Sequence, residues 1–348
     1  MNPYVLTVLL SSLGLGTALT FASSHWLLAW MGLEVNTLAI IPLMAQQHHP
    51  RAVEATTKYF LTQATAAAMI LFASTTNAWM LGEWDITQLS HPVAATTAMI
   101  ALALKMGLAP VHFWLPEVLQ GLDLTTGLIL STWQKLAPFA LVIQIAPNMH
   151  PTMLTTLGVC SALVGGWGGL NQTQLRKILA YSSIAHLGWM IIVLQFAPHL
   201  TLLALGTYIA MTSAAFLTLK STSSTKINTL ALAWTKTPSL AALTALTLLS
   251  LGGLPPLTGF MPKWLILQEL TKQGLPLTAT LMALTALLSL YFYLRLCYAM
   301  TLTISPNTNN STTPWRLPST QNTLPLSLTT TTALALLPLT PAAMALVT

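Results

Sequence analysis

Apolar stretches long enough to cross a lipid bilayer recur along the whole length of this 348-residue chain. A transmembrane helix needs about 20 consecutive, mostly apolar residues. Hydrophobic residues make up 54% of the chain and charged residues only 6%, whereas a soluble domain carries about 25% charged residues. Because backbone polar groups in lipid must be satisfied within the protein itself, this sequence predicts an all-α, polytopic membrane protein.

The apolar windows predict about eleven transmembrane helices within a single transmembrane domain that covers residues 1–348. The expected spans are 3–21, 25–44, 56–80, 92–121, 125–146, 151–170, 175–196, 199–219, 239–271, 276–303 and 324–347. Two of these, 92–121 and 239–271, are longer than a bilayer requires, and proline residues interrupt both.

The distribution of cationic residues predicts the orientation of the chain, because cytoplasmic and matrix loops are enriched in Lys and Arg. The loops after even-numbered spans carry or adjoin Arg51, Lys58, Arg176, Lys177, Lys220, Lys226, Lys236 and Arg316. The opposite side carries Lys272 and the acidic turn at 83–85. We therefore expect the N-terminus on the matrix or cytoplasmic side. No secretory leader precedes the first span, which disfavours a protein of the endoplasmic reticulum or plasma membrane.

Four ionisable side chains lie inside the apolar stretches. They are Glu34, Lys105, Lys135 and Lys263. A charge at the bilayer centre costs roughly 2.5–3.5 kcal/mol, so such residues are usually retained for an ion or proton pathway. A lysine near the end of a span can instead extend to the interface, but Lys135 lies about ten residues, or roughly 15 Å, from either end of its span. The sequence therefore favours a protein that moves protons or other cations.

Two histidines, His112 and His186, also lie within predicted spans. An imidazole changes its protonation state near physiological pH and therefore suits proton relay, but a buried histidine can equally be a hydrogen-bonded core residue. Both interpretations stay open at these positions. The two single cysteines and the scattered loop histidines predict neither a disulfide nor a metal site.

One sequence pattern occurs twice. GLAPVHFWLP at 107–116 is similar to GLPPLTGFMP at 253–262, with Lys105 before the first copy and Lys263 after the second. Proline removes a backbone donor, so each copy is expected to break its helix and to leave a carbonyl, such as that of Gly252, available to water beside a buried lysine. Broken spans at matching places point to a transporter's site, although a packing kink would leave the same pattern.

Five motifs resemble the antiporter-like membrane subunits of respiratory complex I, the NADH:ubiquinone oxidoreductase. They are WMGLEVN at 30–36, KMGLAPVHFWLPE at 105–117, WQKLAP at 133–138, RKILAYSSIAH at 176–186 and GGLPPLTGFMPKW at 252–264. The match extends over essentially the whole chain. Some sister subunits carry glutamate at the position of Lys263, so the lysine narrows the resemblance to one mitochondrial branch of the family in its vertebrate form.

This resemblance implies two inverted antiporter-like helix bundles, each with one proline-broken helix. The first repeat corresponds to about 3–146 and the second to about 151–303, and 324–347 is a C-terminal span. The chain resembles a shortened animal form that lacks the first helices of bacterial members.

The resemblance also implies roles for the buried side chains. Glu34 matches the carboxylate that pairs with Lys105. Lys135 matches the central connecting lysine, and Lys263 the terminal one. The two span histidines named above match polar positions of the same axis less closely.

The implied function is that of a core membrane-arm subunit of an enzyme complex in the inner mitochondrial membrane. Its expected role is a proton path coupled to electron transfer from NADH to ubiquinone. The chain itself is expected to hold no cofactor, metal or redox centre, because the complex uses NADH, FMN, iron–sulfur clusters and ubiquinone elsewhere. The expected partners are other membrane-arm subunits and phospholipid, with no nucleic acid. A free-standing cation/proton antiporter and a structural spacer without proton transfer are the alternatives.

Overall fold

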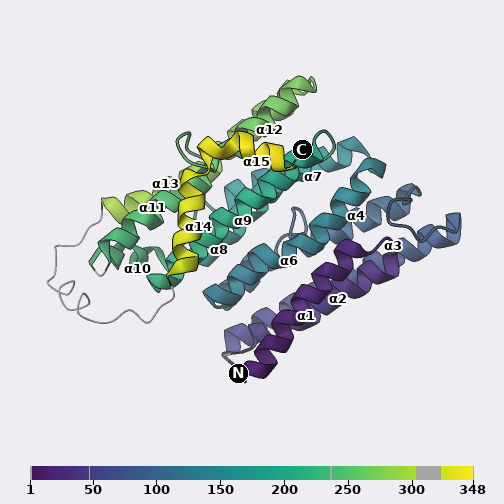
Figure 1. Cartoon of the computed structure of the whole chain (residues 1–348), viewed down its shortest axis with the longest axis horizontal. Coiled ribbons are helices and arrows are strands. Elements are labelled where there is room, and N and C mark those ends of the chain that lie inside the picture. The colour runs from purple at the N-terminus through teal and green to yellow at the C-terminus, as the bar shows by residue number, and fades with distance from the viewer. Residues whose placement is uncertain (1, 47, 236, 303–322, 348) are drawn as a thin grey trace. The chain divides into compact units, whose positions relative to one another are not determined.

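The computed structural model describes residues 2–46, 48–235, 237–302 and 323–347 (Figure 1). Within these ranges the chain forms helices joined by turns and loops, and no β-strand, so the predicted all-α class is confirmed. The chain divides into two compact units, Met1–Leu157 and Gly158–Thr348. Lys236 and Arg316, two of the cations used to predict the orientation, lie outside the described residues.

The first unit contains helices α1 to α6. They are α1 (Pro3–Ala22), α2 (Trp26–Met44), α3 (Pro50–Leu81), α4 (Pro92–Met106), α5 (Trp114–Gly121) and α6 (Leu124–Ile145), followed by a 3-10 turn at Ala146–Asn148. α2 packs on α1 and α3, and α4 and α5 both pack on α3. α6 contacts α1, α2 and α4, so helices of this unit surround α6 on several sides.

The second unit contains most of α7 (Pro151–Gly168) and all later helices. These are α8 (Leu175–Val193), α9 (Pro198–Ser221), α10 (Ile227–Ala231), α11 (Pro238–Gly252), α12 (Phe260–Lys272), α13 (Pro276–Thr301), α14 (Leu324–Ala335) and α15 (Thr340–Val347), with 3-10 turns at Leu232–Thr235 and Leu337–Leu339. α9 contacts α8, α11, α12, α14 and α15, which makes it the central packing helix of the unit.

Proline determines where many of these helices begin. The helices whose first residue is proline are α1, α3, α4, α7, α9, α11 and α13. At this position the missing backbone N–H costs nothing, because the first N–H groups of a helix have no intrahelical partner. Two histidines that sequence alone assigned to loops or interfaces act as caps: His25 Nδ1 accepts from the N–H of Leu27, and His49 Nδ1 from that of Arg51, both at 3.2 Å.

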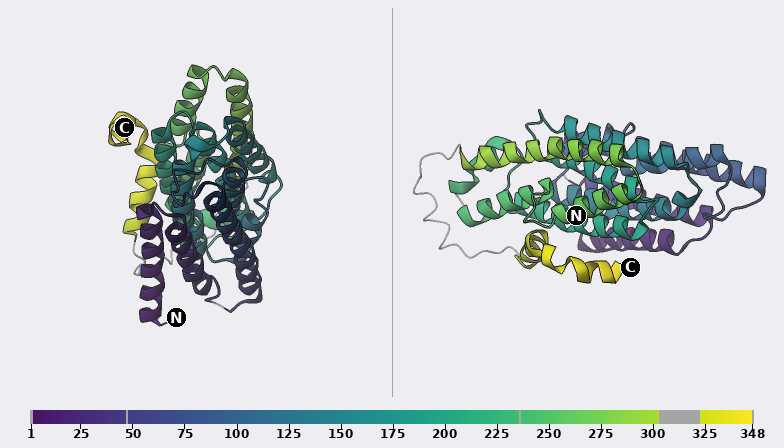
Figure 2. Two further views of the ribbon diagram at one scale, coloured as in Figure 1. Left: turned by 90° about the vertical axis from the view of Figure 1, so that its right-hand side faces the viewer. Right: turned by 90° about the horizontal axis from the view of Figure 1, so that it is seen from above.

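Among the residues that the structure describes, six helical segments are long and apolar enough to cross a membrane. They are α1, α2, α3, α6 with its 3-10 extension, α9 and α13. The pair α14 and α15, which meets at a bend of 70°, would make a seventh; the bend is visible in the yellow C-terminal ribbon of Figure 2. The multi-pass character is thereby confirmed, while the count of about eleven spans stays a prediction.

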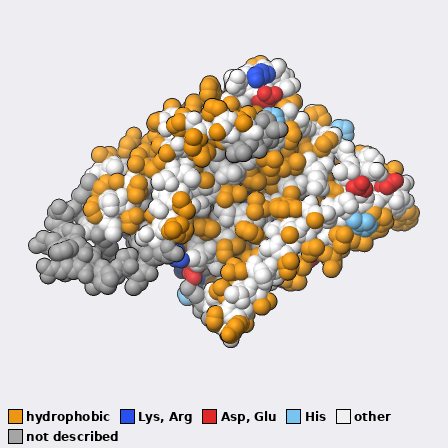
Figure 3. All heavy atoms as spheres, in the orientation of Figure 1, with side chains coloured by type: hydrophobic (Ala, Val, Ile, Leu, Met, Phe, Trp, Pro, Cys, Tyr) orange, Lys and Arg blue, Asp and Glu red, His pale blue; other side chains and the backbone are white. Residues whose placement is uncertain are grey.

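The outer surface of the helices is largely apolar. On the face drawn in Figure 3, hydrophobic side chains cover most of the helices, and the few charged side chains lie towards helix ends. Large exposed side chains include Trp79, Phe72 and Trp167, which are 88%, 57% and 74% accessible. Such a surface is suited to lipid or to other membrane helices rather than to water.

Small residues allow α1 and α2 to pack closely. A Cβ atom added to Gly32 would lie 2.8 Å from the carbonyl oxygen of Gly16, and one added to Gly16 would lie equally close to the carbonyl of Gly32. Small residues at such contacts are typical of helix pairs within membranes. The close packing holds α2, which carries Glu34 and Asn36, against the N-terminal helix.

Candidate functional site

The first break in a predicted span lies between α4 and α5. α4 ends at Met106, and Gly107 takes a left-handed conformation (φ 79°). The N–H groups of Gly107 and Leu108 both donate to the carbonyl of Ala103, each at 2.9 Å. This is a glycine helix cap, in which a left-handed residue lets the chain satisfy its terminal carbonyls. The helix therefore ends at the glycine, before Pro110 is reached.

The second break, between α11 and α12, has the same local structure. α11 ends at Gly252, and Gly253 is left-handed with φ 83°. The N–H groups of Gly253 and Leu254 both donate to the carbonyl of Leu249, at 3.1 and 3.4 Å. The repeated sequence pattern thus corresponds to a repeated backbone structure, with glycine ending the first half of each broken helix.

A different side chain bridges each break. In the first unit the indole N–H of Trp114, on α5, donates to the carbonyl of Leu104 at 2.9 Å. In the second unit Lys263, on α12, donates from Nζ to the carbonyl of Gly252 at 2.8 Å. The Gly252 carbonyl does lie next to a buried lysine, as expected, but it accepts a hydrogen bond from that lysine, whereas the sequence predicted a carbonyl left for water. The Gly252 carbonyl has no intrahelical N–H partner because α11 ends at this residue, and not only because a proline follows that lacks an N–H.

Gly253 provides the space for this contact. A Cβ atom at position 253 would lie 2.9 Å from Nζ of Lys263 and 3.0 Å from its Cδ. A side chain at position 253 would therefore force the end of the lysine side chain to shift from its present position over the break. The left-handed backbone at Gly253 favours glycine for a second, independent reason.

The C-terminal helix α14 contacts the second break. The hydroxyl of Ser250 donates to the carbonyl of Ala333 at 2.7 Å, and the hydroxyl of Thr258 donates to the same oxygen. Ser250 lies in the last turn of α11 and Thr258 lies within the break, and their hydroxyls are 3.2 Å apart. One carbonyl of α14 thereby ties the end of α11 to the chain within the break.

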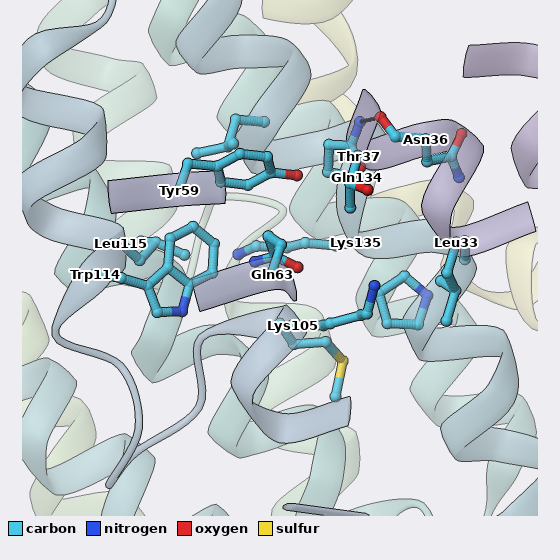
Figure 4. A pocket seen from close by; sticks show the side chains of 14 residues that line it. Leu33, Asn36, Thr37, Tyr59, Gln63, Lys105, Trp114, Leu115, Gln134 and Lys135 are labelled. Atoms are coloured by element: carbon cyan, nitrogen blue, oxygen red, sulfur yellow. Dashed lines mark hydrogen bonds between the residues drawn. The ribbon is translucent and has the colours of Figure 1, made fainter. Parts of the chain in front are cut away.

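In the first unit, Lys105 and Lys135 line one internal cavity of about 20 Å³. Lys105 is 6% exposed and Lys135 is 2% exposed, so neither extends to the surface. The cavity is lined by Leu33, Asn36, Thr37, Tyr59, Gln63, Lys105, Met106, Trp114, Leu115, Leu130, Gln134, Lys135, Ala137 and Pro138. Figure 4 shows the labelled side chains around this common space. Its volume is enough for at least one water molecule.

Several polar atoms in this cavity have no hydrogen-bonding partner among the described residues. They are both side-chain amide atoms of Asn36, Nε2 of Gln63 and Nζ of Lys105. A buried polar group without a partner costs about 1–3 kcal/mol, and water in a polar cavity usually removes that cost. Gln134 rigidifies one wall, since its Nε2 donates to the backbone carbonyl of Asn36 at 3.2 Å. The cavity is therefore built to hold water next to Lys105.

Glu34 lies at the edge of this group. Its carboxylate accepts a hydrogen bond from the hydroxyl of Thr37 at 3.2 Å. It interacts electrostatically with Lys105 and with Tyr59. The ion pairs of the described residues do not include one between Glu34 and Lys105. The two residues are thus close enough to influence each other without direct contact, and their predicted pairing stays a prediction.

The two predicted histidines lie in different units and different settings. His112 lies in the first break, 4% exposed, with Nδ1 3.3 Å from the carbonyl of Pro110 and its ring against Phe113. His186, on α8, is 8% exposed and lines a small cavity with Lys263, which is also 8% exposed. The structure therefore brings His186 together with the terminal lysine, and it leaves His112 outside the lining of the Lys105 cavity.

The second cavity measures about 10 Å³, close to the minimum that a water molecule needs. Its lining residues are Ser182, Ala185, His186, Trp189, Lys263, Ser289 and Tyr293. Of these, sequence reasoning singled out only the histidine and the lysine. Asn36, Gln63 and Tyr293 were missed, although polar side chains inside apolar spans could have suggested them.

Lys58 fits an anchoring role near the surface. Nζ of Lys58 lies 2.7 Å from the carboxylates of both Glu54 and Glu117, and it is 42% exposed. This pair of contacts ties α5 to α3 near the surface. In the part of the chain that the structure describes, no cluster of His, Cys, Asp or Glu could hold a metal ion.

Two family models match the chain. Residues 23–289 match the model described as NADH:quinone oxidoreductase/Mrp antiporter, TM. Residues 290–344 match the model described as NADH dehydrogenase subunit 2 C-terminus. Together they cover both breaks, the three buried lysines, the partly buried Glu34 and α13.

Similar proteins agree with these models. The chain is 80% identical over 346 residues to NADH-ubiquinone oxidoreductase chain 2 of Oncorhynchus mykiss, covering 99% of both chains. It is 79% identical to the same protein of Salmo salar over the full length of both chains. A chain of respiratory complex I from Thermus thermophilus superposes with a TM-score of 0.85 at 29% identity, covering 98% of this chain and 80% of that one. A chain of the Mrp complex from Dietzia has the same fold, with a TM-score of 0.83 at 17% identity over 97% of this chain and 75% of its own.

Proposed function

Because the chain belongs to the NADH-ubiquinone oxidoreductase chain 2 family, we propose that it provides a proton path through the membrane arm of respiratory complex I. Glu34, Lys105, Lys135 and Lys263 are the residues that carry this path. The chain contributes to the enzyme as an antiporter-like membrane subunit. NADH oxidation and ubiquinone reduction occur on other subunits, and this chain holds no redox group of its own.

The observation that carries the proposal is the first cavity. Two buried lysines line it, and its unpartnered amide and amine atoms require water. A core that served packing alone would not retain the unpartnered polar atoms of Lys105, Asn36 and Gln63 around a cavity, because each unsatisfied group costs free energy. Water between Lys105 and Lys135 gives a proton a route from one amine to the other.

Glu34 controls the first step. Its carboxylate stabilises a charged Lys105, and because two ammonium groups in one small cavity repel each other, Lys135 is a neutral amine while Lys105 is charged. A movement of α2 that carries Glu34 away from Lys105 would favour transfer of the proton from Lys105, through water, to Lys135. α2 is positioned for such control because it contacts α1, α3 and α6.

In the second unit Lys263 holds or releases a proton at the break. Its ammonium is stabilised by the carbonyl of Gly252, and His186 lines the same cavity. Release from Lys263 therefore requires that this hydrogen bond be exchanged for a water or a nearby acceptor. Moving one charge against the membrane potential costs about 2.3 kcal/mol per 100 mV, so the redox reaction elsewhere in the complex must drive the cycle.

The repeated breaks support an arrangement of two inverted bundles within about eleven spans. The first repeat comprises about 3–146 and the second about 151–303. The apolar exteriors of the helices contact phospholipid and other membrane-arm subunits, and no nucleic acid. The chain resides in the inner mitochondrial membrane with its N-terminus in the matrix, as the basic loops indicate.

The test uses the assembled complex in proteoliposomes and a Lys135→Met variant. Methionine retains most of the volume of lysine and removes its proton-carrying amine. We expect NADH oxidation with an artificial acceptor to continue while protons translocated per NADH fall. Lys220→Met is the matched control, because Lys220 is exposed at the end of α9, and its ratio should be normal.

Two alternative functions give different results. If the chain were only a spacer, Lys135→Met would reduce the amount of assembled complex and leave protons per NADH unchanged. If it were a free-standing antiporter, it would migrate on a native gel apart from NADH-oxidising activity and would exchange protons for sodium or potassium ions without NADH.

A further inference from the structure

Tyr293, on α13, is a buried polar residue that the proposed path does not yet use. Its side chain is 0% exposed and lines the second cavity with Lys263 and His186. Its hydroxyl interacts with Ser182 but makes no hydrogen bond of normal geometry with any described residue. A phenol oxygen buried in this way is costly unless water or a transferring proton engages it.

Packing alone does not explain the hydroxyl. The ring of Tyr293 packs against Phe292, with centroids 4.5 Å apart, and a phenylalanine at 293 would keep that contact. The hydroxyl adds nothing to the apolar packing and carries a desolvation cost. Tyr293 lines a cavity whose other lining side chains carry an amine, an imidazole, an indole N–H and two serine hydroxyls.

We propose that the hydroxyl of Tyr293 is a proton-relay group between Lys263 and His186. This inference rests on the proposed proton path and adds one residue to its second half. The partners lie on three separate helices, with Lys263 on α12, His186 on α8 and Tyr293 on α13. A hydroxyl is suited to this position because it accepts a proton on its oxygen while donating its own.

The step involves only O–H and N–H bonds. The ammonium of Lys263 gives one proton to the oxygen of Tyr293, directly or through the water that the cavity admits. At the same time the original hydroxyl proton of Tyr293 passes to a ring nitrogen of His186. Lys263 becomes a neutral amine, His186 an imidazolium, and the tyrosine is unchanged after its hydroxyl rotates back. No electron moves, and no further reactant is needed.

The surroundings of His186 suit a group that gains charge. Its ring lies 5.6 Å from that of Tyr208, at an interplanar angle of 46°. Tyr208 interacts with the hydroxyl of Ser183 and electrostatically with Tyr293. These polar groups can reorient around an imidazolium and compensate part of its desolvation.

The test compares Tyr293→Phe with Tyr291→Phe in the assembled complex. Both changes remove one hydroxyl from α13, but Tyr291 is 60% exposed and does not line the cavity. We expect Tyr293→Phe to lose most of the proton translocation per NADH that Lys135→Met loses. Tyr291→Phe should pump normally, and both should retain NADH oxidation with an artificial acceptor.

The outcomes separate this inference from the proposed function. A normal proton ratio in Tyr293→Phe, with a deficient ratio in Lys135→Met, overturns the role of Tyr293 alone. Normal ratios in both variants overturn the proton path as well. A lower yield of assembled Tyr293→Phe complex, with a normal ratio per complex, shows that the hydroxyl is structural and also overturns the inference.

Discussion

Replacing Gly253 with alanine should displace Lys263 and disable the second break. The new Cβ would lie 2.9 Å from Nζ of Lys263, so the lysine must move away from the carbonyl of Gly252. The backbone at 253 also has φ 83°, a conformation that costs a non-glycine residue about 1–3 kcal/mol. The variant therefore combines backbone strain with the loss of one buried hydrogen bond.

The free energy lost with the hydrogen bond can be estimated separately from the backbone strain. A hydrogen bond to a charged group contributes about 1.5–3 kcal/mol. Because each 1.4 kcal/mol corresponds to about a factor of ten, losing the bond between Lys263 and the Gly252 carbonyl should reduce the occupancy of the native lysine position roughly 10- to 150-fold.

Gly274→Ala is the control for backbone strain alone. Gly274 also has positive φ, at 71°, but a Cβ there would meet no atom within 4 Å. The assay is protons translocated per NADH oxidised, measured in proteoliposomes, together with the yield of assembled complex on a native gel. Gly253→Ala should lower the proton ratio, whereas Gly274→Ala should change at most the yield.

Equal behaviour of the two glycine variants would refute this reasoning. It would mean that backbone strain, and not the position of Lys263, accounts for any defect. A Lys263→Met change made in the Gly253→Ala background provides a further check. Since the lysine is already displaced in that background, the second substitution should lower the ratio little more.

Two further predictions follow from the polar contacts. Gln63→Leu removes an amide whose Nε2 has no partner from the Lys105 cavity, and we expect the cavity to lose its water. Coupled turnover should then be slower while assembly is normal. The rates of NADH oxidation with and without an uncoupler measure the effect. Thr258→Val removes a hydroxyl bonded to the carbonyl of Ala333 and should reduce the stability of the assembled complex by about 1 kcal/mol. Native gels of heated samples should show disassembly at a lower temperature. Thr258→Ser should retain that stability.

The buried lysines and the two breaks could be predicted from sequence because each depends on local composition. A lysine in the middle of an apolar span is buried wherever the helix packs, as Lys135 illustrates. The breaks were assigned to proline, whereas the helices end at Gly107 and Gly253. Proline and glycine occur together in both motifs, so the pattern predicted the positions of the breaks correctly. The physical reason is partly different, because a glycine cap and not only a proline ends each helix.

The water cavities could not be predicted in the same way. The lining of the first one comes from α2, α3, α4, α5 and α6, and no local pattern states which of their polar residues meet. Asn36 and Gln63 look like ordinary polar residues in apolar helices until packing leaves their amides unpartnered. The contact between α14 and the second break depends in the same way on residues far apart in the chain.

The central claim is that water connects Lys105 to Lys135 inside the first unit. The most direct measurement is a high-resolution structure of the complete complex in lipid, in which ordered water can be located. The account predicts water within hydrogen-bonding distance of Nζ of Lys105 that leads, directly or through a second water, to Nζ of Lys135. A dry cavity, with these groups hydrogen-bonded only to protein, would contradict it.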